Sequence, residues 1–140
     1  MPFTRILAAI DGSEGSLRAL RVAVELTGLA GGSLTALAVE GPLPAYAATV
    51  GEVDEVKREK DAFFASIVAG ARAEAERAGV ELEVDVRAGH AAEVIVRYAR
   101  EHAFDLVVVG HKGHFLGDYL LGSTADRVAH HAPCPVLIVK

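Results

Sequence analysis

The chain has 140 residues, of which 51% are hydrophobic and 24% charged, and its formal net charge at pH 7 is −5. This length predicts a single domain over residues 1–140, with the composition of a globular protein. Scattered Lys and Arg argue against nucleic acid as a partner, since phosphate neutralisation needs a clustered basic face. No apolar run is long enough to span a bilayer, and no signal-peptide pattern opens the sequence, so we expect a cytoplasmic protein without a membrane partner.

Strand-like and helix-like segments alternate along the chain. Short apolar runs bounded by turn residues predict strands, whereas apolar residues repeated every three or four positions predict helices. Ser13 and Ser123 are of a residue type that caps helix N-termini. In chain order we expect a strand at 5–10, a helix from Ser13 to Gly31, a strand at 33–39, a loop at 41–51, a helix from Val56 to Gly79, a strand at 80–86, a helix at 92–102, a strand at 105–109, a helix at 123–131 and a strand at 136–139.

This alternation predicts an α/β fold. Parallel strands need crossover connections, and helices supply them with right-handed geometry. The central strands are apolar throughout, as in a sheet covered by helices on both sides, and the apolar face of the helix after Val56 is expected in the core. Residues 80–86 instead alternate apolar and acidic side chains, which is typical of a sheet edge. We therefore predict one open parallel sheet with helices on both faces.

The most informative segment follows the apolar run at 105–109. It contains Gly110, Gly113 and Gly122, and it leads directly into Ser123 and Thr124 at the expected start of a helix. Glycines let backbone N–H groups approach a phosphate without interference from a Cβ, and a helix N-terminus adds unpaired donors. The segment therefore predicts an anion-binding loop.

Asp11 follows the first expected strand, and Val39 ends the second. Ligands of open parallel sheets bind outside the carboxyl ends of the strands, where the strand order reverses. If the first and fourth strands are neighbours there, Asp11 and the glycine-containing loop share one crevice. A nucleotide fits this crevice, with its base against the backbone near Val39 and Val109. Its phosphates would take the backbone amides of Gly113, Gly122, Ser123 and Thr124.

Three segments resemble the universal stress protein family: residues 8–14, the glycine-containing loop and residues 132–139. They occur in the family's order and spacing, and the resemblance covers the whole chain. It implies the adenine nucleotide alpha hydrolase-like fold, with five strands in the order 3-2-1-4-5. It also implies a homodimer formed through the last strand, Val136 to Val139, and ATP binding in members that keep the glycine-containing loop.

Carried over position by position, the resemblance implies the roles of the site residues. Asp11 would contact the ribose or adenine side, Ala9 would lie near the base, and Val39 would bond adenine through its backbone. Ribose and phosphates would be held by Gly110, Gly113, Gly122, Ser123 and Thr124. The ligand implied is ATP, with AMP or ADP as alternatives and Mg²⁺ accompanying the phosphates.

One departure from the family pattern affects the choice of ligand. Eight residues separate Gly113 from Gly122, one fewer than is typical of ATP-binding members. Gly117 could absorb the difference, since one extended residue spans about 3.3–3.6 Å. Asp118 adds a negative charge that would repel phosphate unless it faces water or a Mg²⁺ ion.

The leading hypothesis is a small homodimeric protein of the stress response that binds ATP and reports its occupancy to a protein partner. The chain lacks the Gly-Lys-Ser/Thr ending of a P-loop, and no residue is placed to orient an attacking water, so we expect no catalytic residues. Two alternatives remain open. One is a dimeric interaction module with a vestigial cleft, which the short loop and Asp118 favour, and the other is a slow ATPase.

The histidines and the cysteine predict no metal site. His111 and His114 lie in the loop, and the adjacent His130 and His131 would point to different sides of a helix. Cys134 is the only cysteine, which excludes an internal disulfide and a cysteine-based zinc site. Lying between two prolines at a strand entrance, Cys134 is expected to be packed rather than reactive.

Overall fold

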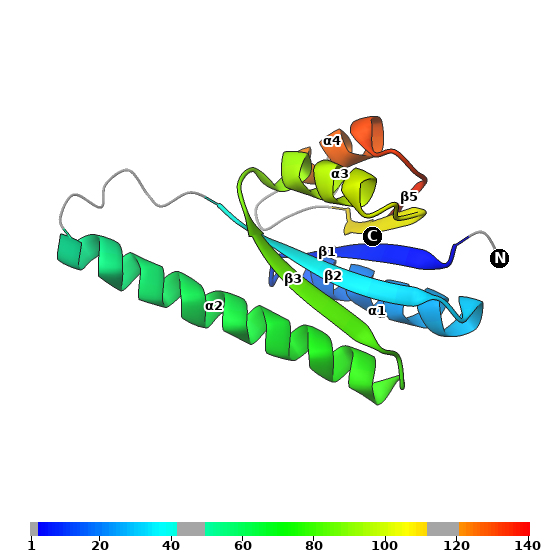
Figure 1. Cartoon of the computed structure of the whole chain (residues 1–140), viewed down its shortest axis with the longest axis horizontal. Helices are drawn as coiled ribbons and strands as arrows, with labels where there is room; N and C mark the ends of the chain where they lie inside the picture. The colour runs from blue at the N-terminus through cyan, green and yellow to red at the C-terminus, as the bar shows by residue number, and fades with distance from the viewer. Residues whose placement is uncertain (1–2, 42–49, 112–120) are drawn as a thin grey trace.

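The computed structural model describes residues 3–41, 50–111 and 121–140. Within these residues, five parallel strands form one sheet and four helices cover it (Figure 1). In chain order the elements are β1 (Arg5–Ile10), α1 (Glu14–Ala30), β2 (Ser33–Glu40), α2 (Val50–Arg77), β3 (Leu82–Ala88), α3 (Ala91–Glu101), β4 (Leu106–Gly110), α4 (Ser123–His131) and β5 (Val136–Val139).

The strand order is β3-β2-β1-β4-β5, which confirms the predicted α/β fold and topology. β1 lies in the middle, where Ala8 pairs with Ala36 of β2 on one side and with Val108 of β4 on the other. The chain builds outward from β1 to β3 and then crosses to β4 on the opposite side. The strand order therefore reverses between β1 and β4, which is where ligands of such sheets bind.

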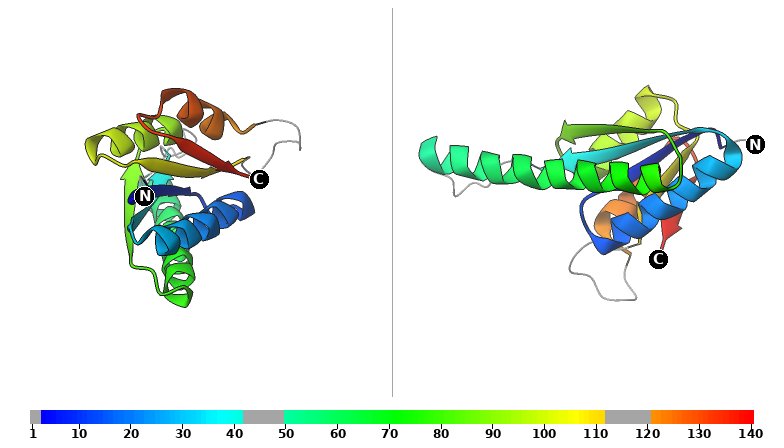
Figure 2. Two further views of the ribbon diagram at one scale, coloured as in Figure 1. Left: turned by 90° about the vertical axis from the view of Figure 1, so that its right-hand side faces the viewer. Right: turned by 90° about the horizontal axis from the view of Figure 1, so that it is seen from below.

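Two helical layers enclose the sheet. Figures 1 and 2 show α1 and α2 on one side and α3 and α4 on the other. Successive side chains of a strand point to opposite faces, so β1 contributes to both cores. Ile6 and Ala8 pack with α1, whereas Leu7 packs with Ile95 and Val128 of the other layer. All three of these β1 side chains are fully buried.

Helix α1 begins and ends as its sequence predicts. Ser13 is the N-cap, and its hydroxyl oxygen accepts a hydrogen bond from the Ser16 N–H at 3.1 Å. Gly31 ends the helix in the left-handed region, with φ of 67°, and its N–H donates to the Thr27 carbonyl. A residue with a Cβ is strained in that conformation, so glycine is the natural terminator.

Helix α2 is longer than predicted. It begins at Val50 rather than Val56, so residues 50 and 51 of the segment expected as a loop are helical. Residues 42–49 of that segment lie outside the described part of the chain. The N-terminal half of α2 extends beyond the end of the sheet (Figure 1). Ala71 and Ala75, in its C-terminal half, are buried, whereas Phe63 is 51% exposed. The prediction that the whole apolar face is core is therefore wrong for the overhanging half, because no strand lies beneath it.

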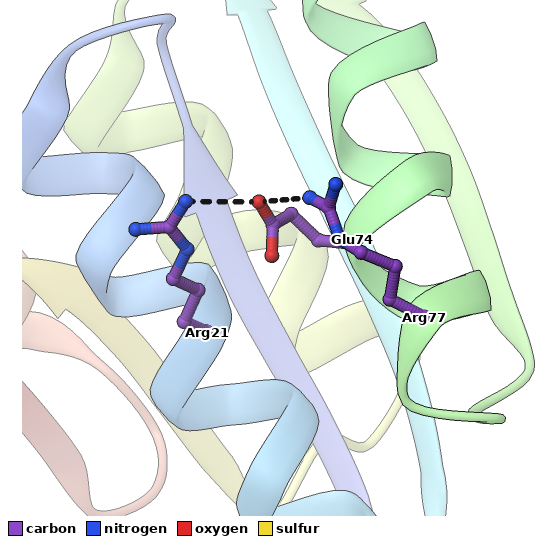
Figure 3. Close-up of polar contacts among 3 residues, drawn as sticks. All are labelled: Arg21, Glu74 and Arg77. Carbon is purple, nitrogen blue, oxygen red and sulfur yellow. Dashed lines mark hydrogen bonds and ion pairs between the residues drawn. The ribbon is translucent and has the colours of Figure 1, made fainter.

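A charged contact also joins α2 to α1. The Glu74 carboxylate accepts from the Arg21 guanidinium at 3.1 Å and from Arg77, one turn further along α2 (Figure 3). The hydrogen bond from Arg21 holds the pKa of Glu74 below its usual range. The Glu74 side chain is 13% exposed, whereas those of Arg21 and Arg77 are 57% and 68% exposed. The contact therefore lies at the surface, where an ion pair contributes modestly to stability.

The edges of the sheet are β3 and β5. β3 was predicted at 80–86 and as an edge strand; the edge position is confirmed, and the strand itself is Leu82–Ala88. Its start shifts because the chain first leaves α2 through Gly79, which has φ of 68°. Among the described helices, none is both long and apolar enough to cross a membrane.

Candidate functional site

A cleft with a volume of about 170 Å³ opens at the carboxyl ends of β1 and β4. Its walls come from the last residues of β1, β2 and β4 and from the first turns of α1, α3 and α4. The cleft therefore lies at the reversal of strand order, where the sequence predicted the ligand. Of the predicted site residues, those that line it are Ala9, Asp11, Val39, Val109, Gly110, Gly122, Ser123 and Thr124. The ninth, Gly113, lies outside the described residues.

The cleft also contains residues that the sequence prediction missed. Leu37 belongs to this group, and it could have been found, because residues two apart on a strand share a face and Val39 had been identified. Ala91 and Ile95 come from the first turns of α3, which the sequence does not connect to the other strand ends. The remaining additions are Ile10, Ser13, Ser16 and Ala125.

The turn between β1 and α1 fixes the Asp11 carboxylate. Asp11 Oδ1 accepts a hydrogen bond from the Ser13 N–H at 2.9 Å, and the Asp11 N–H donates to Ser16 Oγ at 3.2 Å. Ser16 Oγ in turn donates to the Ser13 carbonyl at 3.1 Å. Because both serines are nearly buried, this network holds Asp11 at the mouth of the cleft.

Helix α2 supports this turn from behind. Gly12 has φ of 83°, and a Cβ placed on it would lie 3.2 Å from Phe63 Cζ and 3.3 Å from the Ile67 side chain. Glycine is favoured at this position by its positive φ, whereas the close side-chain atoms could shift by a few tenths of an ångström to admit a Cβ. The exposed Phe63 thus contacts the turn that carries Asp11, although it adds little to the core.

Gly110 lines the cleft, but its lack of a side chain serves the packing of α1. A Cβ on Gly110 would lie 2.9 Å from the carbonyl carbon and oxygen of Gly15 and 3.2 Å from the Ser16 backbone nitrogen. These are main-chain atoms of the first turn of α1, which cannot turn aside as a flexible side chain can. The close approach of β4 to α1 therefore requires glycine here whether or not a ligand binds.

The start of α4 differs from the prediction. Gly122 is the N-cap, and no side chain caps the helix, so Ser123 is its first residue rather than its cap. The Gly122 N–H donates to the His111 carbonyl at 2.9 Å, and the His111 N–H donates to the Val139 carbonyl at 2.8 Å. The Gly122 amide is thus already used by the protein, which removes it from the predicted phosphate donors.

The first residues of α4 supply the remaining donors. The first backbone bond of the helix runs from the Asp126 N–H to the Gly122 carbonyl, so the amides of Ser123, Thr124 and Ala125 have no acceptor within the helix. These amides and the helix dipole give this wall of the cleft a partial positive charge. Among the described lining residues, Asp11 is the one with a formal charge.

Cys134, His130 and His131 are not among the residues that line the cleft. Cys134 packs against the core beneath α3 and α4, as predicted, and burial raises the pKa of its thiol. His130 lies within 3.4 Å of Asp126, one turn earlier on α4. Within residues 3–41, 50–111 and 121–140, no three side chains of the metal-binding types converge. His114 lies outside these ranges.

Fold and cleft together define an α/β domain with a cleft at its topological switch point. The model of the "Universal stress protein family" matches residues 2–140 of the chain, which therefore belongs to this family. The chain is 34% identical over 147 residues to the universal stress protein YxiE of Bacillus subtilis, with 99% of each chain covered.

Two further comparisons support this family membership. It is 36% identical to the universal stress protein Slr1230 of Synechocystis over 98% of its own length, but it spans only 42% of that protein. A solved universal stress protein in complex with cAMP is 28% identical and superposes with a TM-score of 0.78, covering 100% of this chain and 99% of the other. The fold and the family are thereby established.

Proposed function

We propose that the cleft binds an adenine nucleotide, and that the nucleotide is ATP accompanied by Mg²⁺. The observation that carries the proposal is the meeting of Asp11, Val39 and the first amides of α4 around one cleft. These three features come from segments far apart in the sequence, and each suits a different part of a nucleotide. The cAMP complex of the 28% identical relative supports the assignment of ligand class.

The walls of the cleft divide according to this chemistry. Leu37, Val39, Ile95 and Val109 offer apolar surface for a base. The Asp11 carboxylate accepts hydrogen bonds and suits the ribose hydroxyls. The amides and hydroxyls of Ser123 and Thr124 suit phosphate oxygens. Ligand pockets commonly enclose about 300–1,000 Å³, so a nucleotide in this smaller cleft keeps part of its surface exposed.

In this proposal the protein is a cytoplasmic homodimer, and it reports nucleotide occupancy to a partner protein. β5 is an edge strand, and Leu137 on it is 36% exposed. Unprotected edges invite pairing with another chain, and pairing β5 with its own copy would protect both by a two-fold interface. Binding rather than turnover is proposed, with slow ATP hydrolysis as the alternative.

One observation favours a second candidate, an interaction module whose cleft no longer binds nucleotide. The hydrogen bond from Gly122 to His111 withdraws an amide that the leading hypothesis assigned to phosphate. The two candidates differ in one measurable property, which is affinity for nucleotides in the purified protein.

Isothermal titration with ATP and Mg²⁺, AMP and cAMP tests the proposal. We expect binding of at least ATP to the wild-type protein, and at least about tenfold weaker binding in Asp11→Asn, because a hydrogen bond to a charged group contributes about 1.5–3 kcal/mol. Asparagine keeps an oxygen for the Ser13 N–H, so the turn is retained. Asp54→Asn, an exposed position on α2, is the control.

Absence of heat and of any thermal shift with millimolar nucleotide would reject the proposal and favour the module with a vestigial cleft. Phosphate release that persists through purification and is lost in Asp11→Asn would instead favour the ATPase.

A further inference from the structure

A second concave surface lies outside the nucleotide cleft, between α3 and α4. This groove has a volume of about 420 Å³. Its sides carry Arg97, Arg100 and Glu93 from α3 and Arg127 and His131 from α4. No lining residue of the groove also lines the cleft. Figure 2 shows the two helices side by side on the face of the sheet opposite α1 and α2.

The charge of the groove is opposite to that of the whole protein. It holds three arginines and one glutamate, a formal charge of +2, whereas the chain carries −5. Arg97 pairs with Glu93 at 3.3 Å. Among the described residues, no carboxylate lies within ion-pair distance of Arg100 or Arg127, which are both exposed. Two facing helices thus present guanidinium groups that the described part of the chain does not neutralise.

The floor of the groove is apolar. Ala92 is 8% exposed and Val96 is partly buried, and both residues, from α3, line the groove together with the charged side chains. A planar guanidinium bonds a carboxylate through two parallel N–H groups. A partner that combines carboxylates with an apolar side chain would use both the arginines and the floor. A small inorganic polyanion would use the arginines alone.

We propose that this groove docks an acidic segment of a partner protein, one that carries an apolar side chain among its carboxylates. The arginines attract and align the segment, and the apolar side chain covers Ala92 and Val96. Charge complementarity of this kind contributes more to partner selection and association rate than to affinity, so the contact is weak and sensitive to salt. The proposal is independent of nucleotide binding.

Fluorescence anisotropy of a labelled peptide tests it on the full chain. The probe is a fluorescein-labelled peptide of repeated Glu-Glu-Leu, and the uncharged comparison peptide is repeated Gln-Gln-Leu. We expect the acidic peptide to bind at low salt, the uncharged peptide not to bind, and the double variant Arg100→Gln/Arg127→Gln to bind about tenfold more weakly. Both arginines are exposed, so the variant is expected to fold, and circular dichroism checks this.

The matched control is Arg18→Gln/Arg58→Gln, which removes two exposed arginines from α1 and α2 and changes the net charge equally. It should bind the acidic peptide as the wild-type protein does. Equal weakening in both double variants overturns the proposal, since the effect would then follow net charge. Failure of the folded wild-type protein to bind the acidic peptide also overturns the proposal. The same holds if the protein binds inorganic tripolyphosphate or single-stranded DNA but not the peptide.

Discussion

Replacement of Gly110 by alanine distinguishes packing from ligand binding at the end of β4. The added Cβ would lie 2.9 Å from the main chain of Gly15, whereas ordinary contacts begin at 3.4 Å. The first turn of α1 must therefore shift by about half an ångström, against the hydrogen bonds that tie Asp11 to Ser13 and Ser16. Overpacking of this kind costs about 1–3 kcal/mol.

The assay is urea and thermal unfolding followed by circular dichroism, at one protein concentration and without nucleotide. We expect Gly110→Ala to lower the melting temperature by roughly 3–5 °C per kcal/mol lost. Gly70→Ala is the matched control. It makes the same chemical change within α2, where a Cβ meets nothing within 4 Å, and it should stabilise the helix by about 0.5–1 kcal/mol.

An unchanged melting temperature in Gly110→Ala would refute the packing argument. If that variant also lost nucleotide binding, the glycine would be required by the ligand and not by α1.

Two further predictions concern the helix contact and the sheet edge. Replacing Glu74 with glutamine should destabilise the protein at pH 7, because the Glu74 carboxylate pairs with Arg21. The pKa of Glu74 is lowered in the folded state, so the difference in unfolding free energy between Glu74→Gln and wild type should vanish as the pH falls through that lowered pKa. Urea unfolding between pH 7 and pH 3, with the exposed Glu76→Gln as control, measures this, and a difference that persists in acid contradicts it. Leu137→Lys should convert the proposed dimer into a folded monomer in sedimentation analysis, because Leu137 is an exposed residue of an edge strand and a lysine there disfavours pairing with a second strand. A dimer that withstands this change would mean that the subunits associate elsewhere.

The fold was largely readable from the sequence because its signals are local. Ser13 followed by an apolar stripe predicts the start of α1, and the alternation before Val86 predicts an edge strand. Contacts between distant segments were not readable. The approach of Gly110 to Gly15 and the exposure of Phe63 depend on where helices lie against the sheet.

The site was predicted in part for the same reason. The sequence predicts a strand before Asp11, a strand that ends at Val39 and a helix that begins at residue 123. Their meeting at one edge of the sheet therefore followed from the predicted strand order. No sequence pattern indicates the hydrogen bond between Gly122 and His111, because the approach of these two residues depends on the tertiary fold. The cap at Gly122 was likewise missed, since Ser123 is of the more common capping type.

β1 supplies side chains to both cores, and this has a consequence for how the protein unfolds. The sheet separates the two helical layers, yet removing either layer would bring Ile6 or Leu7 into contact with water. The layers are thus tied into a single cooperative unit through the central strand. Any molecule that binds beside α3 and α4 consequently raises the resistance of α1 to denaturation, although it touches neither α1 nor α2.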